Sequence, residues 1–224
     1  MIKREITRFR CIRGAAVIPF VVLLVIMPIS IGTILNTSSY YPEYTYVECM
    51  NILQLAVQPM AIWWPAYMMR DYCDSQTREY LYAYEGKHGN RLATLGFCTV
   101  LYAITMFMLY FMLSNQFYVA PSYVYTDYCI CMVGAIFYMA MCYFFMFLFG
   151  SSLSGVSACV LWVFLSQLLN LQTLPFVGTF FTYSQNSLPH LSQLKFRLLS
   201  VLAMALIFVV LGYIMEKTLP ERGK

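Results

Sequence analysis

Long apolar runs divide this chain into six segments, and polar or charged residues gather in the stretches between them. The runs lie near residues 15–35, 50–69, 92–113, 128–149, 155–175 and 198–215. A hydrocarbon layer about 30 Å thick requires roughly 20 apolar residues in a helix, and each run is close to that length. The runs are continuous and do not alternate with a period of two, which excludes the strands of an outer-membrane barrel. The pattern predicts an all-α integral membrane protein with six transmembrane helices in one domain, residues 1–224.

Composition supports lipid as the solvent of this chain. Of its 224 residues, 61% are hydrophobic and only 11% are charged, whereas a soluble domain carries about 25% charged residues. A soluble domain of this size buries only about 70% of the surface that its unfolded chain exposes. A soluble fold would therefore leave too much apolar surface in water.

The positions of Lys and Arg predict the orientation of the six helices. With both termini in the cytoplasm, twelve of these cations lie inside and two, Lys195 and Arg197, lie outside. Lys195 and Arg197 directly precede the last run, so their long side chains can extend to the outer interface. The predicted outward loops carry acidic residues, among them Asp127 in the third loop. This distribution predicts a multi-pass protein of the cell membrane with cytoplasmic termini.

The segment before the first run has the pattern of an amphipathic helix. Its apolar residues Ile2, Ile6, Phe9 and Ile12 are three or four positions apart, with cations between them. Such a helix lies on the inner surface of a membrane. A basic tail that only sets the orientation explains the same residues equally well.

Residues 70–91 form the most charged part of the chain, with eight charged side chains in 22 positions. Asp74 or Ser75 can cap the start of a helix, and Gly86 with Gly89 marks its end. A short helix here could rest on the lipid surface or enter a groove of a soluble partner. The alternative is a solvated linker whose charges only enforce the topology.

The chain carries no motif that would let it supply its own energy or catalysis. It contains neither GxxxxGKS nor GxxxxGKT, so it lacks a phosphate-binding loop, and no charged side chain lies in the middle of a predicted span. Ion-driven carriers use an ionisable group at depth. HExxH is absent, and the histidines and serines are predicted on opposite sides of the membrane. We expect neither an enzyme nor a metal or cofactor in this chain.

Neutral polar side chains recur in two spans. Gln54 and Gln58 are one helical turn apart in the second span, and Ser166, Gln167 and Asn170 are predicted to share a face of the fifth. Trp63, next to two prolines, is predicted at a kink in the second span. These side chains either bond neighbouring helices together or line a path for a substrate. The segment 176–197 is either a half-inserted outer gate or a surface loop.

The layout resembles the permease subunit of an ABC-2-type ATP-binding cassette exporter. The resemblance covers nearly the whole chain: six spans, inside termini, an amphipathic N-terminal helix and a main cytoplasmic loop between spans two and three. In the loop, Glu79–Tyr80–Leu81 followed by Arg91–Leu92 is similar to the family's acid–Leu pair and basic residue. Gln76–Thr77 stands where the family often has Gly-Thr, and Gly replaces the usual Pro of the turn.

The resemblance implies that residues 74–85 are a coupling helix, which docks on a separate ABC ATP-binding subunit. The implied contact residues are Asp74, Arg78, Glu79, Tyr80, Leu81, Tyr84 and Glu85. ATP and Mg would bind to that partner and not to this chain. A second permease copy would complete a dimer in the lipid bilayer, and no nucleic acid is involved.

The implied function is ATP-driven export of an amphipathic or hydrophobic cargo, with a bacteriocin-like or toxin peptide favoured over a lipid or drug. The implied path residues are Gln54, Gln58, Trp63, Ser166, Gln167 and Asn170. The alternative is a polytopic membrane protein without transport, a sensor or an assembly factor that binds a partner through residues 70–91.

Overall fold

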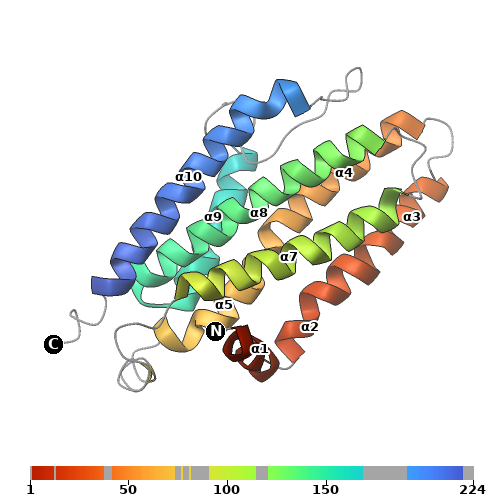
Figure 1. The fold of residues 1–224 in the computed structure, drawn as a ribbon. Coiled ribbons are helices and arrows are strands. Elements are labelled where there is room, and N and C mark those ends of the chain that lie inside the picture. The colour runs from red at the N-terminus through yellow and green to blue at the C-terminus, as the bar shows by residue number, and fades with distance from the viewer. Residues whose placement is uncertain are drawn as a thin grey trace.

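The computed structural model describes residues 2–12, 14–37, 42–73, 77, 81, 91–114, 121–168 and 191–218, and there is no strand among them. Its long helices run side by side as one bundle (Figure 1). The predicted all-α class is therefore confirmed for the described residues.

The helices follow one another along the chain with short connections. They are α1 (Ile2–Cys11), α2 (Gly14–Val21), the π-helical turn η1 (Val22–Ile26), α3 (Met27–Thr37), α4 (Pro42–Met60), α5 (Trp63–Cys73), α7 (Arg91–Ser114), α8 (Pro121–Phe149), α9 (Ser152–Leu168) and α10 (Leu191–Thr218). The segments α2, η1 and α3 continue directly into one another.

Four helical stretches are long and apolar enough to cross a membrane. They are Gly14–Ile34, Arg91–Ser114, Tyr123–Phe149 and Leu194–Thr218. Helix α9 is apolar but shorter, and the predicted second span consists of two helices, α4 and α5. The chain is a helical membrane protein, and the count of six spans stays a prediction.

Prolines interrupt the second predicted span. Helix α4 ends at Met60, just after Pro59, and α5 begins at Trp63, just before Pro65. Between them the amide of Ala61 donates to the carbonyl of Gln58 (3.3 Å), which is a tighter turn than that of an α-helix. Proline has no amide to donate and its ring clashes with the preceding turn. The break that the sequence predicts here is present.

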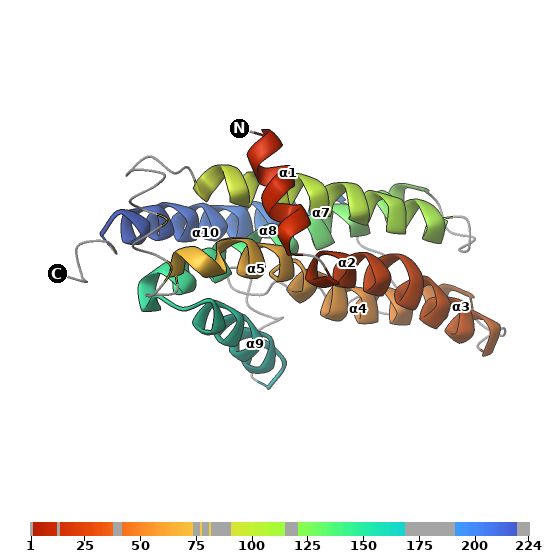
Figure 2. The ribbon, with the colours of Figure 1, turned by 90° about the horizontal axis from the view of Figure 1, so that it is seen from below.

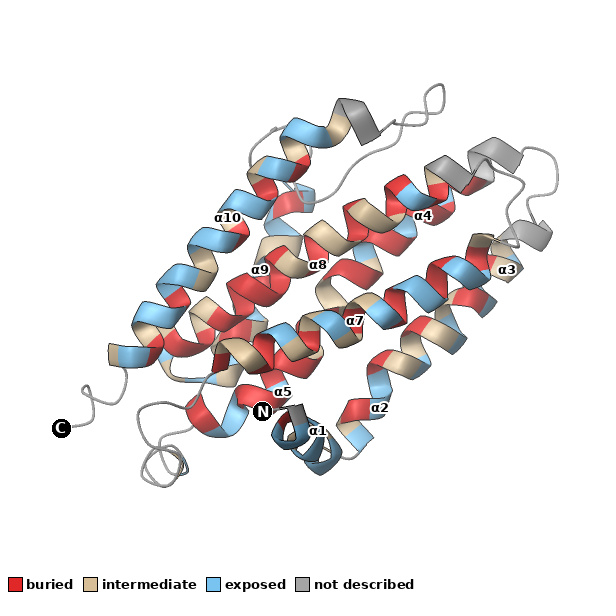
Figure 3. Cartoon of the chain, in the orientation of Figure 1, coloured by how far each residue is buried: buried red, intermediate tan, exposed pale blue. Residues whose placement is uncertain are grey.

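Helix α8 is the centre of the bundle. It packs against α4, α5, α7, α9 and α10. In its candidate span 72% of the residues are buried, against 22% for residues 14–34 and 22% for residues 194–218. Figure 3 shows the same contrast, with α8 mostly buried and α10 exposed along much of its outer side. The exposed side chains of the outer helices include Phe107, Phe111 and Leu206, as expected of faces that meet lipid.

Small residues let helices approach α8 closely. A Cβ at Gly212 of α10 would lie 2.5 Å from the Tyr143 ring of α8, and one at Gly155 of α9 would lie 2.7 Å from the Cys142 carbonyl oxygen. Glycines at such positions permit the close backbone contact by which helices associate in lipid.

The bundle has two distinct ends. Helix α1, the last turn of α5, the first turn of α7 and the last turn of α10 meet at one end, which we call the basal end (Figure 1). Figure 2 shows α1 crossing this end steeply, and α9 diverging from the rest of the bundle. The basal end contains the helix ends that the sequence predicts to be cytoplasmic.

Candidate functional site

Most of the predicted coupling residues lie outside the described part of the chain. These are Asp74, Arg78, Glu79, Tyr80, Tyr84 and Glu85. Leu81 is helical and half-buried, and it packs against the core. Thr77 is helical and exposed, and its hydroxyl donates to the carbonyl of Asp71 (2.9 Å). The coupling helix therefore stays a prediction, anchored between α5 and α7.

The two glutamines of the predicted path are buried on α4. Gln54 and Gln58 are 2% and 0% exposed. A Cβ added to Gly134 of α8 would lie 2.2 Å from Oε1 of Gln58, so the carboxamide rests directly on that glycine. In this copy the amide is enclosed between α4 and α8, and its role in a path stays a prediction.

The polar side chains of α9 have different surroundings. Ser166 is buried, and its hydroxyl donates to the carbonyl of Val163 in the same helix (2.7 Å). Gln167 is exposed, and Asn170 lies outside the described residues. Trp63 is half-buried on α5, and its indole N–H donates to the carbonyl of Ala15 in α2 (2.8 Å). The described structure thus places these predicted path residues on three separate faces.

Glu5 is a buried carboxylate where helix α1 meets α7. Its side chain is 2% exposed, and Thr94 of α7 donates to its Oε2 (2.8 Å). Nη1 of Arg8 lies 3.3 Å from its Oε1. Phe9 packs on the core beside it, while Ile6 is 39% exposed. Helix α1 therefore docks through a buried ion pair as well as through the apolar residues that its spacing predicts.

Tyr72 joins the two cations of this end. Its hydroxyl accepts a hydrogen bond from Nη2 of Arg8. The guanidinium carbon of Arg91 lies 4.3 Å from the centre of its ring, and that of Arg8 lies 5.0 Å away. Both cations are therefore within the range of cation–π attraction.

Arg91 and Glu216 connect α7 to α10. Nε of Arg91 lies 3.5 Å from Oε1 of Glu216, and the Tyr143 hydroxyl of α8 donates to Oε2 of Glu216 (2.5 Å). Arg91 is 2% exposed although it is the first residue of α7. A buried charge is tolerated only when it is paired and hydrogen-bonded.

Together these contacts form one network across five helices, which we call the basal network. Its members are Glu5, Arg8, Tyr72, Arg91, Thr94, Tyr143 and Glu216. Two carboxylates and two guanidinium groups balance in charge. The network can hold α1, α5, α7, α8 and α10 in one arrangement, and any change in it would move several of them.

Sequence reasoning did not identify this network. Arg91 entered only as a basic residue of a loop, and Glu5 and Glu216 were not considered. A signal was present, because each glutamate stands beside cations in an otherwise basic terminal segment. Which cation each one meets depends on helices that are distant in the chain.

A second buried pair lies at the opposite end of the bundle. The hydroxyl of Tyr46 in α4 donates to Asp127 in α8, and both residues are buried. Asp127 was predicted in an outward loop, and that placement is wrong, since α8 begins at Pro121 and encloses it. The tyrosine hydroxyl makes burial of the carboxylate tolerable.

Two hollows flank α9, one of about 330 Å³ against α5 and one of about 520 Å³ against α8. Among the described residues, no three His, Cys, Asp or Glu side chains gather as metal ligands would. In comparisons with known proteins, no family model, curated protein or solved structure matches this chain.

Proposed function

We propose that this chain is the membrane-spanning permease subunit of an ATP-driven exporter of the ABC-2 type. In this proposal the chain crosses the membrane six times, with α4 and α5 forming a broken second span and α9 a short fifth. It works with a second permease copy and a separate ATP-binding subunit, which binds the nucleotide.

The basal network is the observation that carries the proposal. The segment 74–90, which contains the predicted coupling helix, connects the end of α5 to the start of α7. Tyr72 and Arg91 stand at those two helix ends, and both belong to the network. A partner that moved the segment would pull on these two residues first. The force would then reach α1 through Arg8 and α10 through Glu216.

The positions of the buried charges also support an external source of energy. Arg91 is the first residue of α7, and Glu216 lies within the last three residues of α10. Asp127 lies in the first two turns of α8. Chemically, these groups suit the fastening of helix ends, whereas an ion relay needs ionisable side chains at the bilayer midplane.

The path would serve an amphipathic or hydrophobic cargo, with a peptide favoured. The proposed lining residues Gln54 and Gln58 are enclosed between α4 and α8 in this arrangement. They would reach a path between two copies only if α4 moved away from α8. The break at Ala61 and Ile62 allows α4 to tilt without moving α5.

Purification of the tagged full chain from its native membrane tests the proposal. We expect a P-loop ATPase to co-purify, with ATP hydrolysis that rises when the chain is present. The variant Arg78→Glu/Glu79→Arg/Tyr80→Ala should lose both the partner and the hydrolysis. Glu48→Arg is the matched control, since Glu48 is exposed near the opposite end of α4.

Two outcomes would contradict the proposal. In one, the triple variant keeps the ATPase and its hydrolysis unchanged. In the other, the wild-type chain binds a partner without nucleotide-hydrolysing activity, and that partner is lost in the triple variant. The second outcome would identify a sensor or assembly factor.

A further inference from the structure

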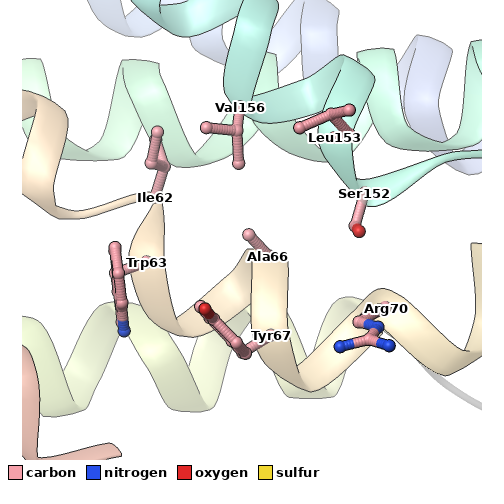
Figure 4. A pocket seen from close by; sticks show the side chains of 8 residues that line it. All are labelled: Ile62, Trp63, Ala66, Tyr67, Arg70, Ser152, Leu153 and Val156. Carbon is pink, nitrogen blue, oxygen red and sulfur yellow. The ribbon is translucent and has the colours of Figure 1, made fainter. Parts of the chain in front are cut away.

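The hollow between α5 and α9 is an amphipathic pocket with walls from both helices. Its volume is about 330 Å³. Figure 4 shows the side chains that line it: Ile62, Trp63, Ala66, Tyr67 and Arg70 from the first helix and its start, and Ser152, Leu153 and Val156 from the second.

Polarity changes along this pocket in one direction. Arg70 and Ser152 lie at one end, and Ile62, Trp63 and Val156 lie toward the other (Figure 4). From Ile62 to Arg70 is eight residues, or roughly 12 Å of helix. Helix α9 begins at Ser152 beside Arg70, so its own order also runs from polar to apolar.

The charged end of the pocket is at the basal end of the bundle. Arg70 lies two residues before Tyr72 of the basal network. It is exposed, and the described part of the chain provides no ion-pair partner for it. The hydroxyl of Ser152 and the first turn of α9 add hydrogen-bond donors beside it. The mouth therefore attracts an anion, while the interior excludes water.

We propose that this pocket binds one anionic phospholipid of the cytoplasmic leaflet. The phosphate contacts Arg70 and Ser152, and an acyl chain lies along Ile62, Trp63 and Val156. The order from charge to hydrocarbon matches the order within a bilayer leaflet, where anionic headgroups attract Lys and Arg. One turn of a helix from a second copy, roughly 10 Å wide and 5.4 Å high, would fill more than the available volume.

A lipid in this position would connect α9 to α5. Helix α9 diverges from the bundle in Figure 2, and the described structure packs it mainly against α8 and α5. The lipid would occupy the space that the divergence leaves open. It would act on the same helix, α5, that leads into the charged segment 74–90.

Thermal unfolding of the full chain in nanodiscs tests this inference. We expect the midpoint to rise when phosphatidylglycerol replaces part of the phosphatidylcholine. Arg70→Gln should weaken the apparent affinity for the anionic lipid roughly tenfold, the effect of losing one charge-assisted contact. Arg70→Lys should keep most of it. Val156→Phe, which fills the apolar end, should also abolish the rise.

Arg10→Gln is the matched control, because Arg10 is an exposed cation of α1. If it lowered the affinity as much as Arg70→Gln, general surface charge would explain the effect and the proposal would fail. The proposal would also fail if inorganic phosphate produced the same rise in neutral nanodiscs, because the site would then bind an anion alone. Native mass spectrometry should show one retained anionic lipid per chain. A dimer that Val156→Phe separates without loss of lipid would overturn the assignment, since a second copy would then occupy the pocket. None of these measurements requires the ATPase, so their outcome is independent of the transport proposal.

Discussion

Arg91 and Glu216 face each other across the basal end of the bundle, 3.5 Å apart and nearly inaccessible to solvent. They are the first residue of α7 and one of the last three of α10. Each is the partner that makes burial of the other tolerable, because an isolated charge in a medium of low dielectric constant is strongly disfavoured. The ion pair therefore fixes the relative position of two helices that share no turn of the chain.

We expect removal of either partner to be more costly than removal of both. Arg91→Gln or Glu216→Gln leaves one buried charge and should lower the free energy of unfolding by about 3–5 kcal/mol. The double variant Arg91→Met/Glu216→Leu should recover most of that loss. Thermal unfolding of the full chain in detergent measures both effects. Lys217→Gln is the control, since Lys217 is exposed beside Glu216. A double variant no more stable than the weaker single variant would contradict this prediction.

Thr94 should be necessary for the docking of α1. Thr94→Val removes the donor to Oε2 of Glu5 and leaves a buried acceptor unsatisfied, which costs about 1–3 kcal/mol. Thr99→Val is the control on the same helix, because the Thr99 hydroxyl donates to its own turn at Leu95. Limited proteolysis should release the N-terminal segment faster from the Thr94 variant alone. Equal release from both variants would contradict a role of the Glu5 contact.

The contact between Gln58 and Gly134 predicts an unusual response to alanine. Gly134→Ala places a Cβ in the position of the carboxamide and should destabilise the chain by about 1–3 kcal/mol. Gly96→Ala in α7 meets nothing within 4 Å and should be neutral or stabilising by about 0.5–1 kcal/mol. Unfolding midpoints in detergent compare the two. Adding Gln58→Ala should restore part of the stability of Gly134→Ala, and no restoration would show that the clash lies elsewhere.

Labelling with a membrane-impermeant thiol reagent tests the orientation. Cys11 is exposed on α1, and it should react only from the cytoplasmic side. In a variant without Cys11 and Cys129, a cysteine introduced by Glu48→Cys should react only from outside. Reaction of both sites from the same side would exclude the predicted topology.

Much of the fold was predictable, because lipid allows few structures. The apolar runs predicted helices, and Pro59 with Pro65 predicted the break between α4 and α5. The boundary of α8 was predicted less well. Asp127 looked like a loop residue, but α8 starts six residues earlier and buries it. Its partner Tyr46 lies 81 residues away in the chain, and no local pattern reveals such a pair.

The candidate site was less predictable than the fold. Spacing identified Gln54 and Gln58 as inward-facing on one side of α4, and both are buried. The segment proposed for coupling lies largely outside the described residues, so its role depends on experiment. The basal network came from the structure alone, since Glu5, Arg91 and Glu216 belong to three separate parts of the chain.

The amino-acid sequence by itself determined that this protein is helical and resides in lipid, because continuous apolar runs can satisfy their backbone in a membrane only as helices. The tertiary structure alone decided which of the few charged side chains are buried and which remain in water. A charge can be buried only where an opposite charge or a hydrogen-bond donor comes within about 4 Å. In this protein that distance is set by the packing of α1, α7 and α10 at one end of the bundle.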